Sequence, residues 1–187
     1  MRKLALTLLV ATGLLEGCGD LPDAAVDEEI TQTSSPLTNS PFTLRNYQTG
    51  LCMGVRAGNP AVTTTFATWA CDGTPNQTFH KGEAYPSDPS AFWLVNHVAA
   101  DRCVHGNAAN GVLPFILNCI QDIHEYWRPV FSGYDFSGHE CYRFQSAQNP
   151  TKLFGVRAGI TSPGTDIMVW DDFNDRFGHP DQFWCIY

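Results

Sequence analysis

The sequence contains little charge, and little of that charge is positive. Only 16% of the 187 residues are charged, and 11 basic side chains face 19 acidic ones, which gives a formal net charge of −8. A nucleic-acid-binding surface needs clustered Lys and Arg to neutralise phosphates, so this balance has the wrong sign for one. We therefore expect no nucleic-acid partner.

Recognisable catalytic, cofactor and metal motifs are missing as well. The chain has no G-x-S-x-G nucleophile elbow and no Gly-rich phosphate loop, which are local signatures of hydrolases and nucleotide-binding enzymes. Its six histidines fall in no nucleophile pattern, and no Cys/His spacing is typical of a zinc site. The sequence predicts a protein that is not an enzyme and that has no cofactor and no metal site.

No stretch of the chain keeps a helical period for long, whereas glycine, proline and aromatic residues are plentiful. There are 16 Gly and 12 Pro, and aromatic residues make up 12% of the chain. Frequent Gly and Pro favour many short strands over long helices, and the aromatic content is typical of a compact domain. We expect an all-β domain.

The N-terminal segment has the features of a targeting signal. Arg2 and Lys3 precede the apolar stretch Leu4–Leu15, which is too short for a membrane-spanning helix. Gly17 before Cys18 resembles the lipobox of bacterial lipoproteins, in which the cysteine carries the lipid. We expect residues 1–18 to be a signal peptide and Cys18 to be the lipid anchor. The protein is then an exported, membrane-anchored lipoprotein of the bacterial cell envelope or, with an ordinary secretory signal, a secreted protein.

Residues 19–41 have the composition of a linker. Five acidic residues are followed by the polar, Pro-containing stretch "TQTSSPLTNSP", and neither part has a usable hydrophobic period. We expect this acidic and polar segment to be a tether, and the folded domain to occupy residues 42–187.

A pentapeptide, GVRAG, occurs at Gly54–Gly58 and again at Gly155–Gly159. Midway between the two lies "CVHGNAANG", which begins at Cys103, and the equivalent positions Cys52, Cys103 and Leu153 are 51 and 50 residues apart. The chain is therefore predicted to contain three repeats rather than two halves. One such unit cannot bury its own apolar face, so the three must share a core.

The three repeats have the same internal order, at about 42–79, 92–127 and 141–187. An alternating apolar segment opens each repeat, two short strands follow, and an aromatic residue closes it, which predicts four strands per repeat and about twelve in all. We expect the three closing aromatic residues to meet in the shared core; they are Phe79, Trp127 and Trp184.

The repeats resemble the ricin B-type lectins, which are β-trefoils. The resemblance rests on the threefold spacing, on the Cys-rich second strand and on a closing motif similar to Gln-x-Trp, found at Gln77–Phe79, Glu125–Trp127 and Gln182–Trp184. It covers Phe42 to Tyr187. It implies a β-trefoil fold and a monomeric protein that binds a glycan or polysaccharide and meets a membrane only through its lipid anchor.

Seven cysteines are present, and Cys18 as the anchor leaves six to pair. The first two repeats hold cysteines at two matching places where the third has Leu153 and Asp172, and loss of both together indicates paired partners. The trefoil resemblance makes the first and last strands of the third repeat neighbours, so their two cysteines pair. The predicted disulfides are Cys52–Cys71, Cys103–Cys119 and Cys141–Cys185.

The resemblance also implies where sugars bind. A sugar presents a face of C–H bonds and a rim of hydroxyls, so its site needs an exposed aromatic face and a few fixed polar groups. In the family these groups are a third-strand aromatic residue, an Asp after the second-strand cysteine and an Asn before the closing Gln. The expected sugar-binding residues are Trp69, Asn76 and Gln77 in the first repeat, and Trp170, Asp181 and Gln182 in the third.

The same comparison shows departures from the family pattern. The position of the family's Asp holds Gly54, His105 and Gly155 in the three repeats, so a neighbouring carboxylate has to replace it. The second repeat has Leu117 where the other two repeats have the third-strand Trp. The candidate replacement carboxylates are Asp72, Asp171, Asp172 and Asp181, and the second repeat has Leu117, His105 and His124 at the site positions.

Two alternatives stay open at this stage. The two Trp residues can be plain core residues, and the trefoil can be a scaffold that binds a protein or inhibits an enzyme through its loops. The longest connections, His80–Ala91 and Pro129–Glu140, are the natural candidates for such loops.

Overall fold

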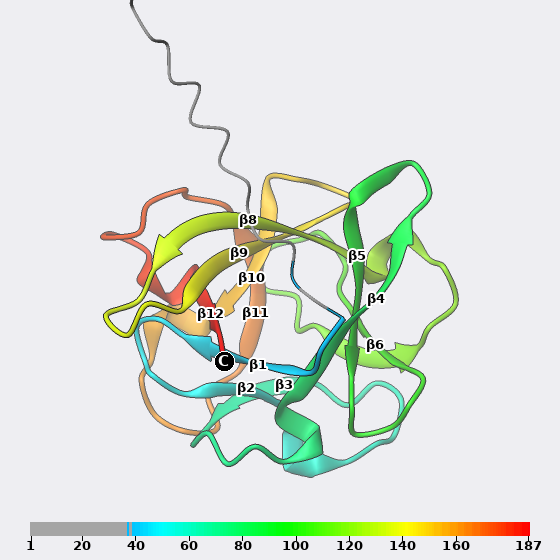
Figure 1. The fold of residues 1–187 in the computed structure, drawn as a ribbon, viewed down its shortest axis with the longest axis horizontal. Helices are drawn as coiled ribbons and strands as arrows, with labels where there is room; N and C mark the ends of the chain where they lie inside the picture. Colours follow the sequence, from blue (N-terminus) through cyan, green and yellow to red (C-terminus); the bar gives the residue numbers. More distant parts are fainter. Residues whose placement is uncertain (1–36, 38) are drawn as a thin grey trace, which may run out of the picture. The chain divides into compact units, whose positions relative to one another are not determined.

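A computed structural model of the chain describes residue 37 and residues 39–187 (Figure 1). Twelve strands and five short 3₁₀ turns make up the regular structure of this part of the chain. No helix in it is long and apolar enough to cross a membrane. The all-β class predicted from the sequence is confirmed.

Each repeat contributes four strands, as predicted. The first repeat forms β1 (Phe42–Asn46), β2 (Cys52–Val55), β3 (Phe66–Trp69) and β4 (Thr78–Tyr85). The second forms β5 (Asp88–Asn96), β6 (Arg102–His105), β7 (Phe115–Asn118) and β8 (Tyr126–Tyr134). The third forms β9 (Glu140–Ser146), β10 (Lys152–Val156), β11 (Ile167–Asp171) and β12 (Trp184–Ile186).

The first and last strands of the repeats close into a ring. β1 pairs with β4, β4 with β5, β5 with β8, β8 with β9, β9 with β12, and β12 returns to β1. In Figure 1 β4 runs beside β5, and β8 beside β9. Closure leaves these six strands without the unpaired edges that invite aggregation.

The middle strands of each repeat form three hairpins, β2–β3, β6–β7 and β10–β11, and each pairs with the ring through its first strand. Backbone hydrogen bonds join the hairpins to one another in a cycle. Ile116 N–H donates to Thr64 O (2.9 Å), Val169 N–H to Val112 O (2.8 Å) and Thr68 N–H to Thr165 O (2.9 Å). This pseudo-threefold arrangement is the β-trefoil that the repeats predicted.

The core lies where the repeats meet. Phe79, Trp127 and Trp184 are fully buried and belong to one hydrophobic cluster, which confirms that the closing aromatic residues converge. The two indole N–H groups donate to Val104 O (2.8 Å) and Phe154 O (3.2 Å), so burial leaves neither of them unpaired. The core is thus assembled from all three repeats and from none alone.

Three disulfides join the pairs that the sequence predicted: Cys52–Cys71, Cys103–Cys119 and Cys141–Cys185. The first two tie a second strand to the loop after the third strand of the same repeat. The last ties β9 to β12, which pair directly at these cysteines. Each bridge closes a loop of a size that contributes roughly 3 kcal/mol in the chain-entropy model.

Two expectations about connections are corrected. The segments His80–Ala91 and Pro129–Glu140 are not loops, because β4 pairs with β5 as far as Tyr85 and Asp88, and β8 pairs with β9 as far as Tyr134 and Glu140. Both hairpins contain register shifts, which break the simple alternation that reveals a strand in the sequence. Leu37, which precedes the first strand, is buried in the main hydrophobic cluster.

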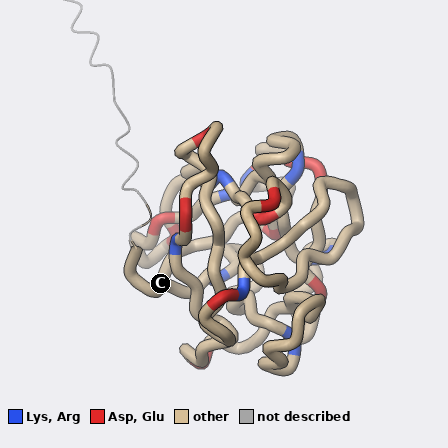
Figure 2. Tube along the Cα trace, turned by 90° about the vertical axis from the view of Figure 1, so that its right-hand side faces the viewer, with Lys and Arg blue, Asp and Glu red and all other residues tan. Residues whose placement is uncertain are grey.

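Charged residues are spread over the domain. Figure 2 shows Lys and Arg as separate short stretches, several of them beside Asp or Glu. One ion pair is buried and spans two elements of the third repeat, Arg143 on β9 and Asp172 after β11, with 8% and 7% of their side chains exposed.

Candidate functional site

A pocket of about 390 Å³ lies beside the half-buried ring of Trp69 in the first repeat. Trp69 is the last residue of β3 and lies opposite Cys52 of β2. Asp72, Thr74 and Asn76 line the same pocket. Side-chain and backbone hydrogen bonds from Thr74 lower the pKa of Asp72, so this carboxylate is charged at neutral pH.

A second pocket, of about 470 Å³, lies beside the half-buried ring of Trp170 in the third repeat. Phe173 and His179 form its outer wall, with their rings stacked at a centroid distance of 3.9 Å. The carboxylate of Asp181 also lines it and makes no hydrogen bond with another described residue. Burial raises the pKa of Asp181.

The repeated pentapeptide forms the same turn beside both pockets. Its 3₁₀ turns Arg56–Gly58 and Arg157–Gly159 contain two successive left-handed residues, with φ of 53° and 60° in one and 49° and 62° in the other. The Ala and Gly of each turn line the adjacent pocket. The pentapeptide GVRAG thus recurs in the two repeats in which this turn forms a wall of the pocket.

Neighbouring side chains occupy the space beside Gly54 and Gly155, where the ricin B-type family has an Asp. A Cβ at Gly54 would lie 3.0 Å from Cγ of Gln77 and 3.1 Å from Cδ1 of Trp69. A Cβ at Gly155 would lie 3.2 Å from Cγ of Gln182 and 3.4 Å from Oδ2 of Asp181. The glycines leave no void, and in the third repeat the Asp181 carboxylate lies next to the position of the missing acid.

Of the four candidate carboxylates, two line neither pocket and are bound by basic side chains. Asp171 binds Lys152 and accepts from Asn110 (2.8 Å). Asp172 is buried with Arg143 and accepts from Gln145 (2.7 Å). Asp72 and Asp181 remain as the carboxylates that line the two pockets.

The two predicted glutamines, Gln77 and Gln182, are buried, and each side-chain amide already has backbone partners. Each donates to a carbonyl at the end of the third strand and accepts an N–H from the loop that follows, which fixes the loop against the pocket. The partners are Ala70 O (2.8 Å) and Asp72 N (3.0 Å) for Gln77, and Asp171 O (2.7 Å) and Phe173 N (3.3 Å) for Gln182.

Two buried asparagines support the pockets and were not singled out from the sequence. Asn96 Nδ2 donates to Asn76 O (3.0 Å), and Asn46 Nδ2 donates to Asp181 O (2.8 Å). Each therefore holds the polar site residue of the preceding repeat around the ring. The signal available in the sequence was the Asn that ends both opening segments, "FTLRN" and "FWLVN".

The second repeat builds a different arrangement at the equivalent place. Leu117 stands opposite Cys103, where the other repeats have Trp. His105, Asp122 and His124 come together beside it, with potential ligand atoms within 4.8 Å of one another.

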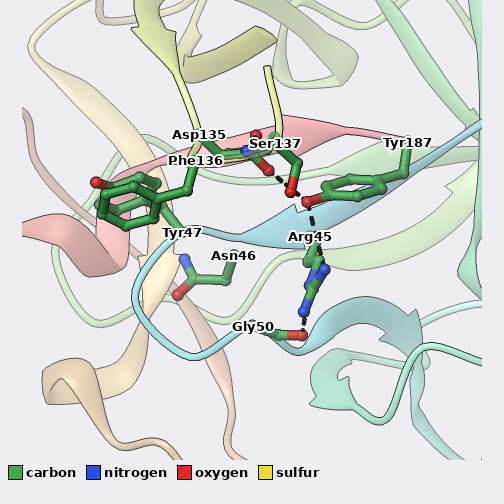
Figure 3. Close-up of a pocket in the computed structure, with 9 residues that line it drawn as sticks. Arg45, Asn46, Tyr47, Gly50, Asp135, Phe136, Ser137 and Tyr187 are labelled. Carbon is green, nitrogen blue, oxygen red and sulfur yellow. Dashed lines mark hydrogen bonds between the residues drawn. The ribbon is translucent and has the colours of Figure 1, made fainter. Parts of the chain in front are cut away.

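A third cavity, of about 180 Å³, was not anticipated and lies where the C-terminus meets the β8–β9 hairpin (Figure 3). Figure 3 shows Arg45, Asp135 and Tyr187 turned toward one another, with the rings of Tyr47 and Phe136 to one side. The Tyr187 hydroxyl donates to Asp135 and accepts from Arg45 (3.3 Å), whose Nε donates to Gly50 O (2.8 Å). These polar groups pair with one another, which indicates a structural tie.

Comparison with protein families gives a match that covers the first half of the domain. Residues 31–113 match the family model described as ricin-type beta-trefoil lectin domain-like. Comparison with curated proteins gives no match.

Solved structures similar to this chain are β-trefoils. The designed threefold-symmetric protein ThreeFoil has a TM-score of 0.65 at 14% identity, over 78% of this chain and 96% of that one. The agglutinin of Rhizoctonia solani has a TM-score of 0.64 at 15% identity, over 80% and 95%. The ricin B-like lectin of Macrolepiota procera, solved in complex with lactose, has a TM-score of 0.60 at 16% identity, over 80% and 95%. The described domain therefore has the β-trefoil fold of ricin B-like lectins.

Proposed function

We propose that this protein is a non-catalytic carbohydrate-binding protein that holds one sugar against Trp69 and another against Trp170. The observation that carries the proposal is that both indoles are half-buried at a pocket rather than sealed in the core. Each pocket adds a carboxylate and amide or imidazole groups at its rim. An aromatic face with a few fixed polar groups is the arrangement that a sugar ring needs.

In the third repeat the acceptor is Asp181. Its carboxylate makes no hydrogen bond with another described residue, and nearby His179 interacts with it electrostatically. Ionised oxygens accept hydrogen bonds from two adjacent hydroxyls of a sugar. Phe173 and His179 extend the apolar wall beyond Trp170. We place this site first because it combines the larger pocket with a free acceptor.

In the first repeat the polar rim is Asp72 and Asn76. The Asn76 side chain contacts the Thr74 hydroxyl, and its Nδ2 lies 3.3 Å from a Cβ built at Gly54, where the family has its Asp. Gln77 and Gln182 act as positioning residues, because their amides already hold the pocket loops. The similarity to a lectin solved with lactose supports the sugar class but leaves this chain's own sugar to be tested.

We also propose that the domain works outside the cytosol, exported by residues 1–18 and anchored through Cys18 or secreted. The three disulfides support this, because structural disulfides persist in oxidising compartments and are rare in the cytosol. Incorporation of labelled fatty acid into the wild-type chain, and its loss in Cys18→Ala, tests the anchor. Release of the unmodified wild-type chain into the medium would favour the secreted form.

An immobilised glycan array tests the binding proposal, with dense presentation because single sites of this kind are weak. We expect Trp69→Ala and Trp170→Ala each to weaken their site about tenfold, since aromatic contacts of this type contribute about 1 kcal/mol or more. Leu117→Ala, the matched change at the third position, should leave binding unchanged. A wild-type chain that binds no hexose, pentose or cell-wall polymer would refute the proposal.

A protein-binding scaffold is the second candidate function. It is favoured by two fully presented aromatic side chains, Phe136 (100% exposed) between β8 and β9 and Phe177 (95% exposed) between β11 and β12. Aromatic side chains are enriched among the residues that anchor protein–protein interfaces. Under this alternative, the double variant Phe136→Ser with Phe177→Ser abolishes binding of the protein partner, and Trp170→Ala leaves it intact. Under the glycan proposal, Trp170→Ala weakens glycan binding and the double Phe variant leaves it intact.

A further inference from the structure

In the second repeat, metal-ligating side chains occupy the place that the other repeats use for a pocket. His105 is the last residue of β6, and Asp122 precedes the 3₁₀ turn Ile123–Glu125, which carries His124. One potential ligand atom from each lies within 4.8 Å of the others. His105 matches Gly54 and Gly155, and His124 matches Asn76 and Asp181.

The imidazole of His105 makes no hydrogen bond with another described residue. Its side chain is only 14% exposed, its Nδ1 is buried without a hydrogen bond, and its Nε2 lies 3.9 Å from Oδ2 of Asp122, beyond hydrogen-bond distance. The ring is stacked between Phe115 (centroids 4.7 Å apart) and His124 (5.2 Å). The nitrogen that faces Asp122 is Nε2, and because it makes no hydrogen bond it is the ring atom placed to take a further partner.

The backbone that carries these side chains is held in place on both sides. Gly106 N–H donates to His124 O (3.0 Å), which joins the end of β6 to the 3₁₀ turn. Asp122 Oδ1 caps that turn by accepting from the His124 backbone N–H (3.2 Å) and lies 2.6 Å from Nδ1 of the same residue. The side chains of Asp122 and His124 are partly exposed, so an ion from solvent can reach them and they can rotate.

We propose that His105, His124 and Asp122 bind a divalent transition-metal ion of the Zn²⁺ class, with water as the fourth ligand. Two imidazole nitrogens and one carboxylate form a donor set that suits Zn²⁺, whereas Ca²⁺ and Mg²⁺ prefer oxygen ligands alone. Bonds of about 2.0–2.1 Å in a tetrahedral site place ligand atoms about 3.4 Å apart. Rotation of Asp122 and His124 closes the remaining gap and exchanges their mutual hydrogen bond for metal bonds.

This site is independent of glycan binding, and the sequence predicted no metal site. The histidines are 19 positions apart in numbering (105 to 124) with only Asp122 beside them, which matches no zinc spacing. The trefoil brings them together because β6 and the 3₁₀ turn of one repeat pack side by side, as the Gly106–His124 bond shows.

Titration of Zn²⁺ into the untagged full chain, in a Cys18→Ser background that removes the free thiol, tests the proposal. We expect one ion per chain and an upward shift of the melting temperature with Zn²⁺. His105→Gln and His124→Gln should each weaken Zn²⁺ binding by about 100-fold or more, since even outer-shell changes cost about 10- to 100-fold at metal sites. Co²⁺ in place of Zn²⁺ should give the visible absorption of a tetrahedral site.

The matched control is His80→Gln, which removes a histidine from a different pair, His80 Nδ1 to His97 Nε2 at 2.8 Å. It should leave Zn²⁺ affinity unchanged. If His105→Gln fails to fold by near-UV circular dichroism, His124→Gln, a partly exposed side chain on a turn, decides alone. Absence of Zn²⁺ binding in the wild-type chain, equal binding in the folded His124→Gln variant, or an equal loss in His80→Gln overturns the proposal. The glycan array is unaffected by any of these outcomes, so failure here is distinct from failure of the sugar sites.

Discussion

Single residues decide what each repeat of this trefoil can do. The equivalent third-strand residues are Trp69, Leu117 and Trp170, and the two indoles line the pockets described above. All three lie opposite the equivalent residue of the second strand. Substitutions at these positions should therefore change function without changing the fold.

Binding at the third-repeat site should depend on pH through Asp181. Burial raises the pKa of Asp181, and only the ionised carboxylate accepts from two hydroxyls. Affinity should therefore fall as the pH is lowered, and at a higher pH than the ordinary Asp value of about 3.9 would give. Titration with the sugar in a Trp69→Ala background isolates the site. The Asp181→Asn variant should bind the sugar more weakly, and its affinity should not depend on pH. An affinity that still changes with pH in this variant would show that another group titrates.

Glu125 stands where the other repeats have the closing Gln. Its Oε2 accepts from Ile120 N–H (3.0 Å), but its Oε1 is buried without a partner, and burial raises the pKa of Glu125. Glu125→Gln supplies the N–H donor that Gln77 and Gln182 use toward a strand carbonyl. We expect the free energy of unfolding at neutral pH to rise by about 1 kcal/mol in urea titrations. The reverse change, Gln182→Glu, should lower it by a similar amount, and a less stable Glu125→Gln would contradict this account.

At the scale of elements, the third repeat replaces a disulfide by an ion pair. In the first two repeats a bridge ties the second strand to the loop after the third strand. In the third, Leu153 and Asp172 occupy those positions, and Asp172 is held instead by Arg143 and Gln145 of β9. The same loop is thus fastened by a different chemistry.

Removal of the Arg143 side chain should strongly destabilise the fold, because it leaves the buried carboxylate of Asp172 without its ion-pair partner. We expect Arg143→Met to lower the free energy of unfolding by about 3–5 kcal/mol, measured by chemical denaturation. The double variant Arg143→Met with Asp172→Leu should recover much of that loss, since it leaves no unpaired charge. A double variant whose loss equals the sum of the two single losses would mean that the pair is not coupled.

At the scale of the whole molecule, the ring holds two pockets on one domain in a fixed relation. They belong to the first and third repeats, which are neighbours because β1 pairs with β12. Two weak sites on one body bind a surface far more tightly than either binds a free sugar.

Loss of one site should therefore have unequal effects in two assays. On a dense immobilised glycan we expect Trp170→Ala to lower the apparent affinity about tenfold, which is the loss at its own site, whereas binding of a free monosaccharide at the intact Trp69 site stays unchanged. Leu117→Ala serves as the control in both assays. Equal losses in both assays would indicate a single functional site.

The sequence by itself determined the threefold repeat, the twelve strands, the convergence of Phe79, Trp127 and Trp184 and the cysteine pairing in the first two repeats, whereas the resemblance to a trefoil supplied Cys141–Cys185. The repeat-derived features follow from a pattern of about 50 residues that recurs in register. The alternation of buried and exposed side chains within a strand is likewise visible in the local sequence. The sequence did not predict the ends of the β4–β5 and β8–β9 hairpins, because bulges interrupt the alternation of apolar and polar residues there.

Tertiary structure alone decided which polar groups are free. Asp171 and Asp172 were as plausible as Asp181 in the sequence, yet Asn110 lies 61 positions from Asp171, and Arg143 lies 29 positions from Asp172. The grouping of His105 with Asp122 and His124 likewise depends on how β6 meets a 3₁₀ turn. A side chain's availability depends on partners that the fold brings from distant positions, and no local spacing encodes them.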